Sequence, residues 1–314
     1  MKFISLTLSC LTKSRIVAIL SLQQVSKSYG KIQALKNVSF DIPQGSVFGI
    51  LGPNGSGKTT LLSIILDVLK ADTGTYLWFG QPGSPDMRKK IGSLLETPNF
   101  YHYLSATNNL RITNSISGRG AAKDDIDTVL QKVKLYERRN SRFSTYSLGM
   151  KQRLAIAASL LGDPAVLVLD EPTNGLDPVG IAEIRELMIE LNKKGHTIIM
   201  ASHLLDEVEK VCTHVAILKT GTLITSGDVE EVLADEDVVE ISSADNNALL
   251  QLLSSVNPDM KIIQSGNFLQ LHYPKGNARP EELNSFCFSK GITLHHLALR
   301  KKRLEAKFFE LTSN

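Results

Sequence analysis

Short apolar segments alternate with amphipathic segments along the first three quarters of the chain. Val47–Leu51 and Ala165–Leu169 are almost entirely apolar, which is typical of strands buried on both faces of a mostly parallel sheet. Other segments carry apolar residues at helical spacing. The pattern predicts the strands Leu20–Val25, Val38–Ile42, Val47–Leu51, Thr75–Phe79, Ala165–Leu169, Thr197–Ala201 and Val215–Leu218, and the helices Thr59–Lys70, Met150–Leu161 and Ile181–Lys194. Because strands alternate with helices, we expect an α/β fold with a three-layer core.

Residues 97 to about 160 interrupt this alternation. A helical pattern runs from Thr107 to about Arg139 and is broken near Gly118–Gly120, and Gly162-Asp163-Pro164 ends the next helix. We therefore expect a helical subdomain at about 97–160, inserted into a main domain over 19–235.

The pattern changes again in residues 236–314. It predicts, in order, the strand Val238–Ser243, the helix Asn246–Val256, the strands Lys261–Gln264 and Phe268–His272, the helix Pro280–Ser289, the strand Ile292–Leu299 and the helix Leu304–Leu311. The order βαββαβ predicts a small ferredoxin-like α+β domain. It carries no nucleophile, metal cluster or glycine-rich loop that the sequence reveals, so a regulatory or packing module is the favoured interpretation.

Composition narrows the class of protein. The formal net charge of +3 is too small for the strongly basic stripe expected of a nucleic-acid-binding domain, so we expect no nucleic acid partner. The three cysteines, Cys10, Cys212 and Cys287, are odd in number and lack metal-like spacing, which fits a reducing cytoplasm better than a disulfide framework. No apolar run reaches the ~18–20 residues of a membrane-spanning helix.

The first residues have a superficial likeness to a signal peptide. Met1–Leu20 contains an early lysine and an apolar stretch, but Lys13 and Arg15 interrupt it and no small-residue cleavage site follows. We expect residues 1–18 to form an extension without stable structure, ahead of the first strand.

A phosphate-binding loop follows the apolar strand Val47–Leu51. Gly52-Pro53-Asn54-Gly55-Ser56-Gly57-Lys58-Thr59 fits the pattern G-x-x-x-x-G-K-[ST] without a mismatch. Its glycines allow backbone N–H groups to point at phosphate oxygens, and the following helix presents its positive N-terminal end to the same anion. Lys58 is expected at the β- and γ-phosphates and Thr59 at Mg²⁺. The strand before the loop and the helix after it supply the context that the motif requires.

Two acidic residues end the other apolar strand. Asp170 and Glu171 follow Ala165–Leu169, and a carboxylate at the tip of such a strand is where Mg²⁺ is held beside a phosphate loop. We predict that Asp170 holds Mg²⁺ and that Glu171 polarises the attacking water as general base. Alone, the pair could be two surface carboxylates at a strand end. Beside the phosphate loop the catalytic interpretation is favoured.

Three further segments identify a family. They are Tyr146-Ser147-Leu148-Gly149-Met150-Lys151-Gln152-Arg153, then Asp170-Glu171-Pro172-Thr173-Asn174-Gly175-Leu176-Asp177-Pro178, then Ala201-Ser202-His203. This ordered set resembles the nucleotide-binding subunit of ATP-binding cassette (ABC) transporters over residues 20–235. The resemblance implies the corresponding fold, with a RecA-like core, an antiparallel β subdomain and an α-helical subdomain. It also implies a dimer in which two copies close around two MgATP.

The resemblance implies roles for single residues. Tyr29 is similar to the aromatic residue that stacks on adenine, although a tyrosine before a turn often only packs. Ser147 and Gly149 match the signature loop that reaches the γ-phosphate bound to the other subunit, and Asp177 matches the loop that crosses the dimer interface. His203 matches the histidine that contacts the γ-phosphate and orients the water. The nucleotide-binding set implied is Tyr29, Gly52, Pro53, Asn54, Gly55, Ser56, Gly57, Lys58, Thr59, Thr60, Glu96, Ser147, Gly149 and Asp177, with Thr59, Asp170 and Glu96 at the metal.

The chain departs from the usual family pattern at two places. Where most cassettes have the signature sequence LSGGQ, this chain has Tyr146-Ser147-Leu148-Gly149-Met150. The larger side chains of Leu148 and Met150 are expected to narrow the signature loop. Glu96 stands where most have a glutamine linked to Mg²⁺; a carboxylate there could bind the metal more strongly or slow turnover. Both departures are similar to the cassettes of bacitracin-type and lantibiotic-immunity exporters, as is Pro98–Tyr101. In the family this last region receives the permease, although its aromatic residues could also pack the helical subdomain.

The resemblance favours an ATP-hydrolysing subunit of an exporter, bound peripherally to the cytoplasmic face of the membrane and driving a separate permease. Export of peptide antibiotics is the branch-level expectation. A soluble cassette ATPase acting on ribosomes or DNA is the alternative, but such relatives usually have two cassettes or a long coiled-coil insertion. An importer subunit is a further alternative, disfavoured by Glu96 and the Tyr146–Met150 loop.

Overall fold

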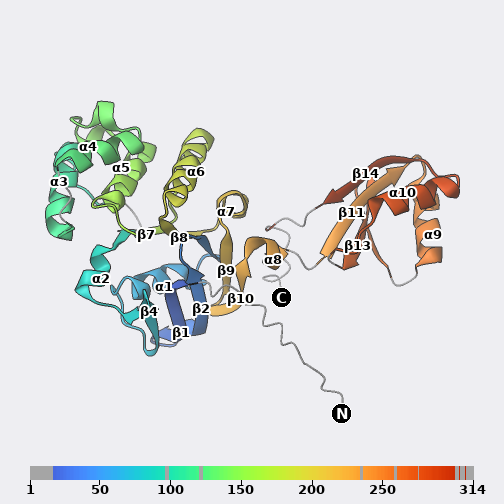
Figure 1. The fold of residues 1–314 in the computed structure, drawn as a ribbon, viewed down its shortest axis with the longest axis horizontal. Helices are drawn as coiled ribbons and strands as arrows, with labels where there is room; N and C mark the ends of the chain where they lie inside the picture. Colours follow the sequence, from blue (N-terminus) through green and yellow to red (C-terminus); the bar gives the residue numbers. More distant parts are fainter. Residues whose placement is uncertain are drawn as a thin grey trace, which may run out of the picture.

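A six-stranded sheet lies at the centre of the larger part of the molecule (Figure 1). The computed structural model describes residues 17–95, 99–119, 123–233, 236–257, 260–274 and 276–300, together with Leu304 and Phe308. The strands follow one another in the sheet as β10 (Thr222–Asp228), β9 (His214–Lys219), β3 (Val47–Leu51), β8 (Thr197–Ser202), β7 (Val166–Asp170) and β6 (Ile91–Leu94). All neighbours are parallel except β10 and β9. The carboxyl ends of β3, β7 and β8 therefore meet at one edge, where an α/β sheet binds its ligand.

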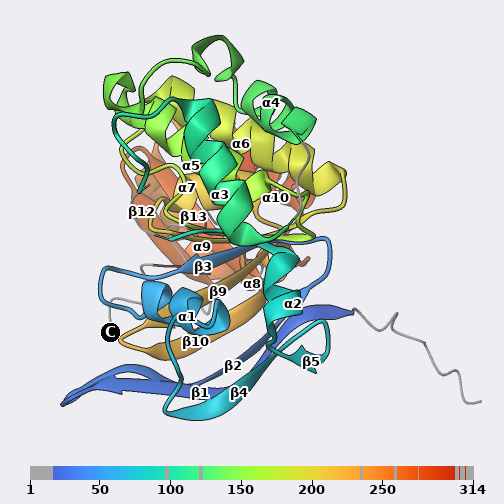
Figure 2. The same ribbon diagram turned by 90° about the vertical axis from the view of Figure 1, so that its left-hand side faces the viewer.

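A second, antiparallel sheet lies beneath the first. It contains β2 (Ile32–Pro43), β1 (Ala18–Tyr29), β4 (Thr73–Trp78) and β5 (Gln81–Pro82) in that order. Helix α1 (Lys58–Ile65) lies between the two sheets (Figure 2). Its buried Leu61, Leu62 and Ile64 belong to one apolar cluster with Leu20 of β1 and Ile50 of β3. Burial of this cluster fixes the helix that follows the phosphate loop.

Helices cover the other face of the central sheet. They are α5 (Leu148–Leu160), α6 (Pro178–Lys193) and α7 (Leu205–Val211), with α3 (Ala106–Ser117), α4 (Lys123–Lys132) and the short 3₁₀ turns Tyr136–Arg138 and Phe143–Thr145 outside them. In Figure 1 α3 to α6 gather on the side of the molecule away from β1, β2 and β4. The remaining helices of this part are α2 (Pro85–Lys89) and α8 (Val229–Leu233). The chain is thus an α/β cassette with an antiparallel sheet and a helical subdomain, as the resemblance implies.

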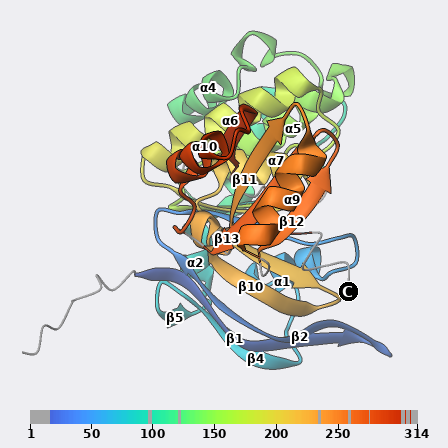
Figure 3. The same ribbon diagram turned by 90° about the vertical axis from the view of Figure 1, so that its right-hand side faces the viewer.

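A small α+β domain follows at the C-terminal end. It consists of β11 (Glu236–Ser243), α9 (Asn246–Val256), β12 (Lys261–Ser265), β13 (Phe268–Pro274), α10 (Pro280–Ser289) and β14 (Leu294–Arg300). The sheet order is β12-β13-β11-β14, with antiparallel neighbours throughout. Helices α9 and α10 cover the face that is turned away from the cassette (Figure 3). The βαββαβ order matches the expectation, whereas the domain boundary at 235/236 stays a prediction.

Several boundaries differ from the sequence prediction for identifiable reasons. The helix predicted over Thr59–Lys70 ends at Ile65, because the chain turns there and Asp67 is left-handed, with φ 62°. Strands β6 and β10 and the short α2 and α8 were not predicted. Strand β10 alternates between exposed and half-buried residues, so it has no continuous apolar run. Strand β1 begins at Ala18, inside the extension predicted over residues 1–18, whose first sixteen residues lie outside the described part. Of the helix predicted over Leu304–Leu311, only Leu304 and Phe308 are described.

Candidate active site

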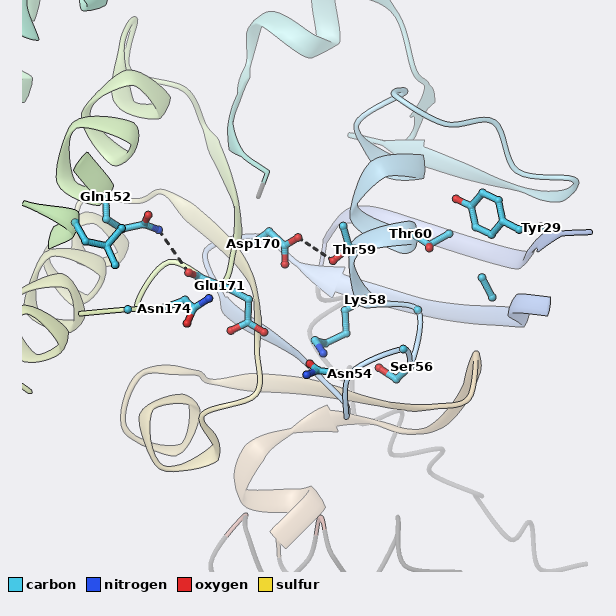
Figure 4. A pocket seen from close by; sticks show the side chains of 15 residues that line it. Tyr29, Asn54, Ser56, Lys58, Thr59, Thr60, Gln152, Asp170, Glu171 and Asn174 are labelled. Carbon is cyan, nitrogen blue, oxygen red and sulfur yellow. Dashed lines mark hydrogen bonds between the residues drawn. The ribbon is translucent and has the colours of Figure 1, made fainter. Parts of the chain in front are cut away.

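A cavity of about 800 Å³ lies at the carboxyl edge of the central sheet (Figure 4). Its wall combines the phosphate loop, the end of β7, the start of α5 and the β1–β2 hairpin. The lining residues are Tyr29, Ala34, Asn54, Gly55, Ser56, Gly57, Lys58, Thr59, Thr60, Leu148, Gln152, Asp170, Glu171, Asn174 and Gly175. The volume of this cavity is typical of a small-molecule site.

The phosphate loop is held in a conformation that requires glycine. Gly57 has φ 103°, and a Cβ on it would overlap the backbone carbonyl oxygen of Ala34. The loop leads directly into α1, which begins at Lys58. The N–H groups of the first helical turn have no partner within a helix and are available to an anion. This geometry is the one that the sequence motif predicts.

Lys58 is the buried cation of the site. Its side chain is 7% exposed as a residue, and its Nζ donates hydrogen bonds to the carbonyl oxygens of Gly52 at 2.7 Å and Pro53 at 3.3 Å. Burial lowers its pKa below the ordinary value, while the negative charges of Glu171 and Asp170 act in the opposite direction. An anion in the cavity would therefore gain a cation that water hydrates only partly.

Thr59 and Asp170 bring two oxygen ligands together from segments far apart in the sequence. The Thr59 hydroxyl donates to Oδ2 of Asp170 at 2.9 Å (Figure 4). Asp170 is the last residue of β7 and is 4% exposed. A hydroxyl and a carboxylate are oxygen donors of the kind Mg²⁺ takes in phosphoryl-transfer sites. The donor set therefore fits Mg²⁺.

Glu171 is held by contacts from three segments. Its backbone is left-handed, with φ 49°. Its N–H donates to the carbonyl of Ala201 at 3.0 Å, and its carbonyl accepts from Asn174 N at 3.1 Å and Gln152 Nε2 at 3.4 Å. Oε2 of its carboxylate is hydrogen-bonded to Nδ1 of His203 at 2.8 Å. A non-glycine residue in this region costs on the order of 1–3 kcal/mol and tends to occur at functional sites.

The other predicted residues occupy different positions. Tyr29 lines the cavity and is 48% exposed. The Ser147 hydroxyl caps α5 and accepts from Met150 N at 3.3 Å. Ser147, Gly149 and Asp177 are not among the residues that line the cavity of this single chain. Asp177 instead caps α6 by accepting from Gly180 N at 2.8 Å. Glu96 lies outside the described residues.

Some lining residues had no role assigned from the sequence. Ala34, Gln152, Asn174 and Gly175 all line the cavity. Gln152 and Asn174 lie inside the two motifs that identified the resemblance, so their position in the motif was the available signal. Ala34 carries no chemical signal, because its contribution depends only on the course of the β1–β2 hairpin.

Known proteins resemble the chain at the sequence level. A family model described as "ABC transporter" matches residues 35–174. An uncharacterised ABC transporter ATP-binding protein of Bacillus subtilis is 42% identical over 298 residues, which cover 94% of this chain and 96% of that protein. The bacitracin transport ATP-binding protein of Bacillus licheniformis is 33% identical over 300 residues, with 93% and 97% covered. The lantibiotic transport ATP-binding protein of Streptococcus pyogenes is 40% identical over 206 residues, with 66% and 89% covered.

Solved structures resemble the cassette part. A nucleotide-free ATP-binding cassette from an ABC transporter has a TM-score of 0.63 and 27% identity, covering 68% of this chain and 92% of that one. A dimeric cassette in a post-hydrolysis state, bound to ADP and phosphate, has a TM-score of 0.61 and 28% identity, covering 67% and 98%. The two Bacillus relatives thus extend further along the chain than these structures do.

Proposed function

The chain belongs to the family of ABC transporter ATP-binding proteins, and from this premise we propose that two copies close around two MgATP and drive a separate membrane permease. The family is one of ATPases, so ATP hydrolysis is the reaction. The observation that carries the proposal is the convergence of Lys58, Asp170 and Glu171 on one cavity at the edge of the central sheet.

Each part of the cavity suits one part of MgATP. The N–H groups of residues 54–60 and the Lys58 ammonium bind the phosphates, and the ring of Tyr29 stacks on the adenine. Thr59 and Asp170 hold Mg²⁺, which when bound neutralises charge on the phosphate oxygens. Glu96 is proposed as a further contact to the metal from the sequence resemblance alone.

Glu171 and His203 are proposed as the catalytic residues. The Glu171 carboxylate accepts a proton from the attacking water as general base. His203 keeps that carboxylate oriented through the 2.8 Å contact of Nδ1 with Oε2, which leaves Nε2 on the opposite edge of the ring. In the closed dimer Nε2 contacts the γ-phosphate.

The second copy completes the site. Ser147 caps α5 and Gly149 lies in its first turn, and the N-terminal N–H groups of this helix can bind phosphate. Ser147 and Gly149 do not line the cavity of their own chain, which supports a role at the nucleotide of the partner. Val179, two residues after Asp177, is 66% exposed, and an apolar side chain that projects beside such a loop suits an interface between two copies.

A membrane permease and a peptide cargo are the remaining parts of the proposal. Among the residues that the structure describes, no helix is long and apolar enough to cross a membrane. The names of the relatives support transport, and the bacitracin transport protein matches 93% of the chain, including the C-terminal part. We therefore propose export of peptide antibiotics, with the chain at the cytoplasmic face of the membrane.

Two experiments test this function. The purified chain should release phosphate from ATP in the presence of Mg²⁺, and gel filtration with MgATP should detect a dimer of the Glu171→Gln variant. A chain that stays monomeric with saturating MgATP would contradict the shared site. For the cargo, a strain lacking the chain should become sensitive to bacitracin-type peptides. Unchanged sensitivity would refute the cargo and leave the ATPase function intact.

A further inference from the structure

The first turn of α5 packs against the loop of residues 171–176, and in each segment a leucine lies over a glycine of the other. The Leu148 side chain covers Gly175 so closely that a Cβ at residue 175 would overlap its Cδ2. In return, Cδ2 of Leu176 lies 3.4 Å from the place where a Cβ on Gly149 would be. Each of these two segments, the first turn of α5 and the loop of residues 171–176, thus packs a leucine side chain against a glycine of the other.

The same two segments share a hydrogen bond next to the catalytic carboxylate. Nε2 of Gln152 donates to the backbone carbonyl of Glu171 at 3.4 Å (Figure 4). Gln152 is 5% exposed and lies one helical turn after Leu148. The loop itself is internally bonded, since Asn174 N donates to the Glu171 carbonyl and Leu176 N to the Thr173 carbonyl. A displacement of α5 would therefore be passed to the backbone of Glu171.

Leu148 is one of the places where this chain departs from the usual signature loop. Most cassettes carry glycine at this position of the signature loop, and a glycine could not cover Gly175. Gly175 is left-handed, with φ 72°, so a side chain at residue 175 is disfavoured by the backbone as well as by Leu148. The Leu148 side chain is 55% exposed. Packing within the single chain does not require a large apolar side chain at such an exposed position.

We propose that Leu148 is a positioning residue that couples the two ATP sites of the dimer. This inference rests on the proposed function, in which Ser147 and Gly149 contact the nucleotide of the partner. When these residues engage that nucleotide, the first turn of α5 becomes fixed. Leu148 packs on Gly175 and Gln152 hydrogen-bonds the backbone carbonyl of Glu171. Through these two contacts, the first turn of α5 fixes the Glu171 carboxylate in the chain's own site. Occupation of one site thereby prepares the other for hydrolysis.

The test compares ATP hydrolysis by the full chain and its variants over a range of ATP concentrations. Leu148→Ala should lower kcat at least about twofold, because contacting positions are usually coupled by 0.5–3 kcal/mol. Its Hill coefficient should fall toward about 1, as expected when the coupling between sites is lost. Leu148→Met, which can still cover Gly175, should restore most of both values. Ile116→Ala, at an apolar residue that is 80% exposed on α3, is the matched control and should behave as wild type.

A double-mutant cycle and a dimer assay make the result decisive. Gly175→Ala should impair hydrolysis more in the wild-type chain than in the Leu148→Ala chain. In the Leu148→Ala chain, the new Cβ at residue 175 has no leucine side chain to overlap with. Additive effects, or a Leu148→Ala chain with wild-type kcat and Hill coefficient, would overturn the proposal. So would a Leu148→Ala/Glu171→Gln chain that no longer dimerises with ATP, since Leu148 would then be an interface residue. Failure of the proposed function is distinct: the wild-type chain itself would neither hydrolyse ATP nor dimerise.

Discussion

Nδ1 of His203 and Oε2 of Glu171 lie 2.8 Å apart, and the contact joins the loop after β8 to the residue after β7. The two strands are parallel neighbours, with Asp170 opposite Ala201. The Glu171 backbone is left-handed at φ 49° and donates its N–H to Ala201. The carboxylate is therefore oriented by the same strand pair that carries the histidine, and a change at either residue alters the other.

Replacement of Glu171 by glutamine should separate ATP binding from hydrolysis. Glutamine keeps the shape and the backbone contacts but cannot accept a proton, so hydrolysis should fall by about 10²–10⁴-fold, the usual contribution of general base catalysis. Nucleotide binding should persist. Phosphate release measures the first effect and gel filtration with MgATP the second. Glu186→Gln, at an exposed glutamate of α6, is the charge-matched control; equal activity of the two variants would exclude Glu171 as the base.

His203→Ala should leave Glu171 in place but free to rotate. The backbone bonds of Glu171 to Ala201, Asn174 and Gln152 do not involve the imidazole, so ATP should still bind. Misplacement of a catalytic group by about 1 Å can cost on the order of 10²-fold in rate, and kcat should fall by up to that factor. His203→Gln, which can hydrogen-bond the carboxylate, should retain more activity. His295→Ala, at an exposed histidine of the C-terminal domain, controls for the loss of an imidazole. A His203→Ala chain with wild-type kcat contradicts the assignment.

The phosphate loop could be predicted because its residues are contiguous in the sequence. Gly57 and Lys58 lie in one motif whose backbone conformation follows from its own glycines, and the apolar strands that present Lys58 and Asp170 are evident from five consecutive apolar residues. The helical insertion and the C-terminal βαββαβ order follow from periodicity in the same way. Local signals of this kind identify elements and the residues at their ends.

Contacts between distant segments could not be predicted in this way. The packing of Leu148 on Gly175 and the bond from Gln152 to Glu171 depend on how α5 lies against the loop after β7. Leu148 was noted only as narrowing its loop, and Gln152 had no assigned role. Strand β10 was missed because it is an edge strand with alternating exposure, which gives a weaker signal than a buried strand. Glu96 stays a prediction from the sequence.

Lys58→Met should abolish stabilisation of the folded chain by ATP. Without nucleotide the ammonium donates hydrogen bonds to the carbonyls of Gly52 and Pro53, and methionine fills a similar volume. At ATP concentrations 100-fold above Kd, ligand binding should stabilise the wild-type chain by about 2.7 kcal/mol, an increase that Lys58→Met should lack. Thermal unfolding with and without MgATP measures it. An undiminished ATP-dependent rise in Tm for Lys58→Met would show that the loop binds nucleotide without the lysine.

The pH dependence of the nucleotide-free chain should depend on the same lysine. Burial lowers the folded-state pKa of Lys58 below its ordinary value of 10.5, so between these two values the unfolded chain binds more protons than the folded chain. The contribution of Lys58 to the free energy of unfolding therefore rises as the pH rises through its folded-state pKa toward 10.5. Relative to Lys58→Met, the wild-type chain should gain stability in alkaline denaturation experiments. Lys193→Met, at an exposed lysine of α6, should show no such relative gain over the same range. A constant difference between wild type and Lys58→Met would contradict the prediction.

Acid should weaken the sheet of the C-terminal domain through Glu240. Arg300 Nε donates to Oε2 of Glu240 at 2.8 Å and Gln270 Nε2 to Oε1 at 3.1 Å, which tie β14 and β13 to β11. These hydrogen bonds, with that of Arg300 first, hold the pKa of Glu240 below its ordinary value of 4.5. The stabilisation is therefore fully present above pH 4.5 and is lost as the pH falls through the folded-state pKa.

Glu240→Gln tests this by amide hydrogen exchange in β11 and β14. Near neutral pH, exchange in these strands should be about two- to fivefold faster than in the wild type, because Arg300 is largely exposed and partly exposed ion pairs contribute modestly. The difference should disappear in acid below the folded-state pKa of Glu240. Glu282→Gln, at an exposed glutamate of α10 in the same domain, should leave exchange in β11 and β14 unchanged at both pH values. A difference between Glu240→Gln and the wild type that persists unchanged in acid would mean that the glutamate side chain stabilises the sheet by packing rather than by its charge.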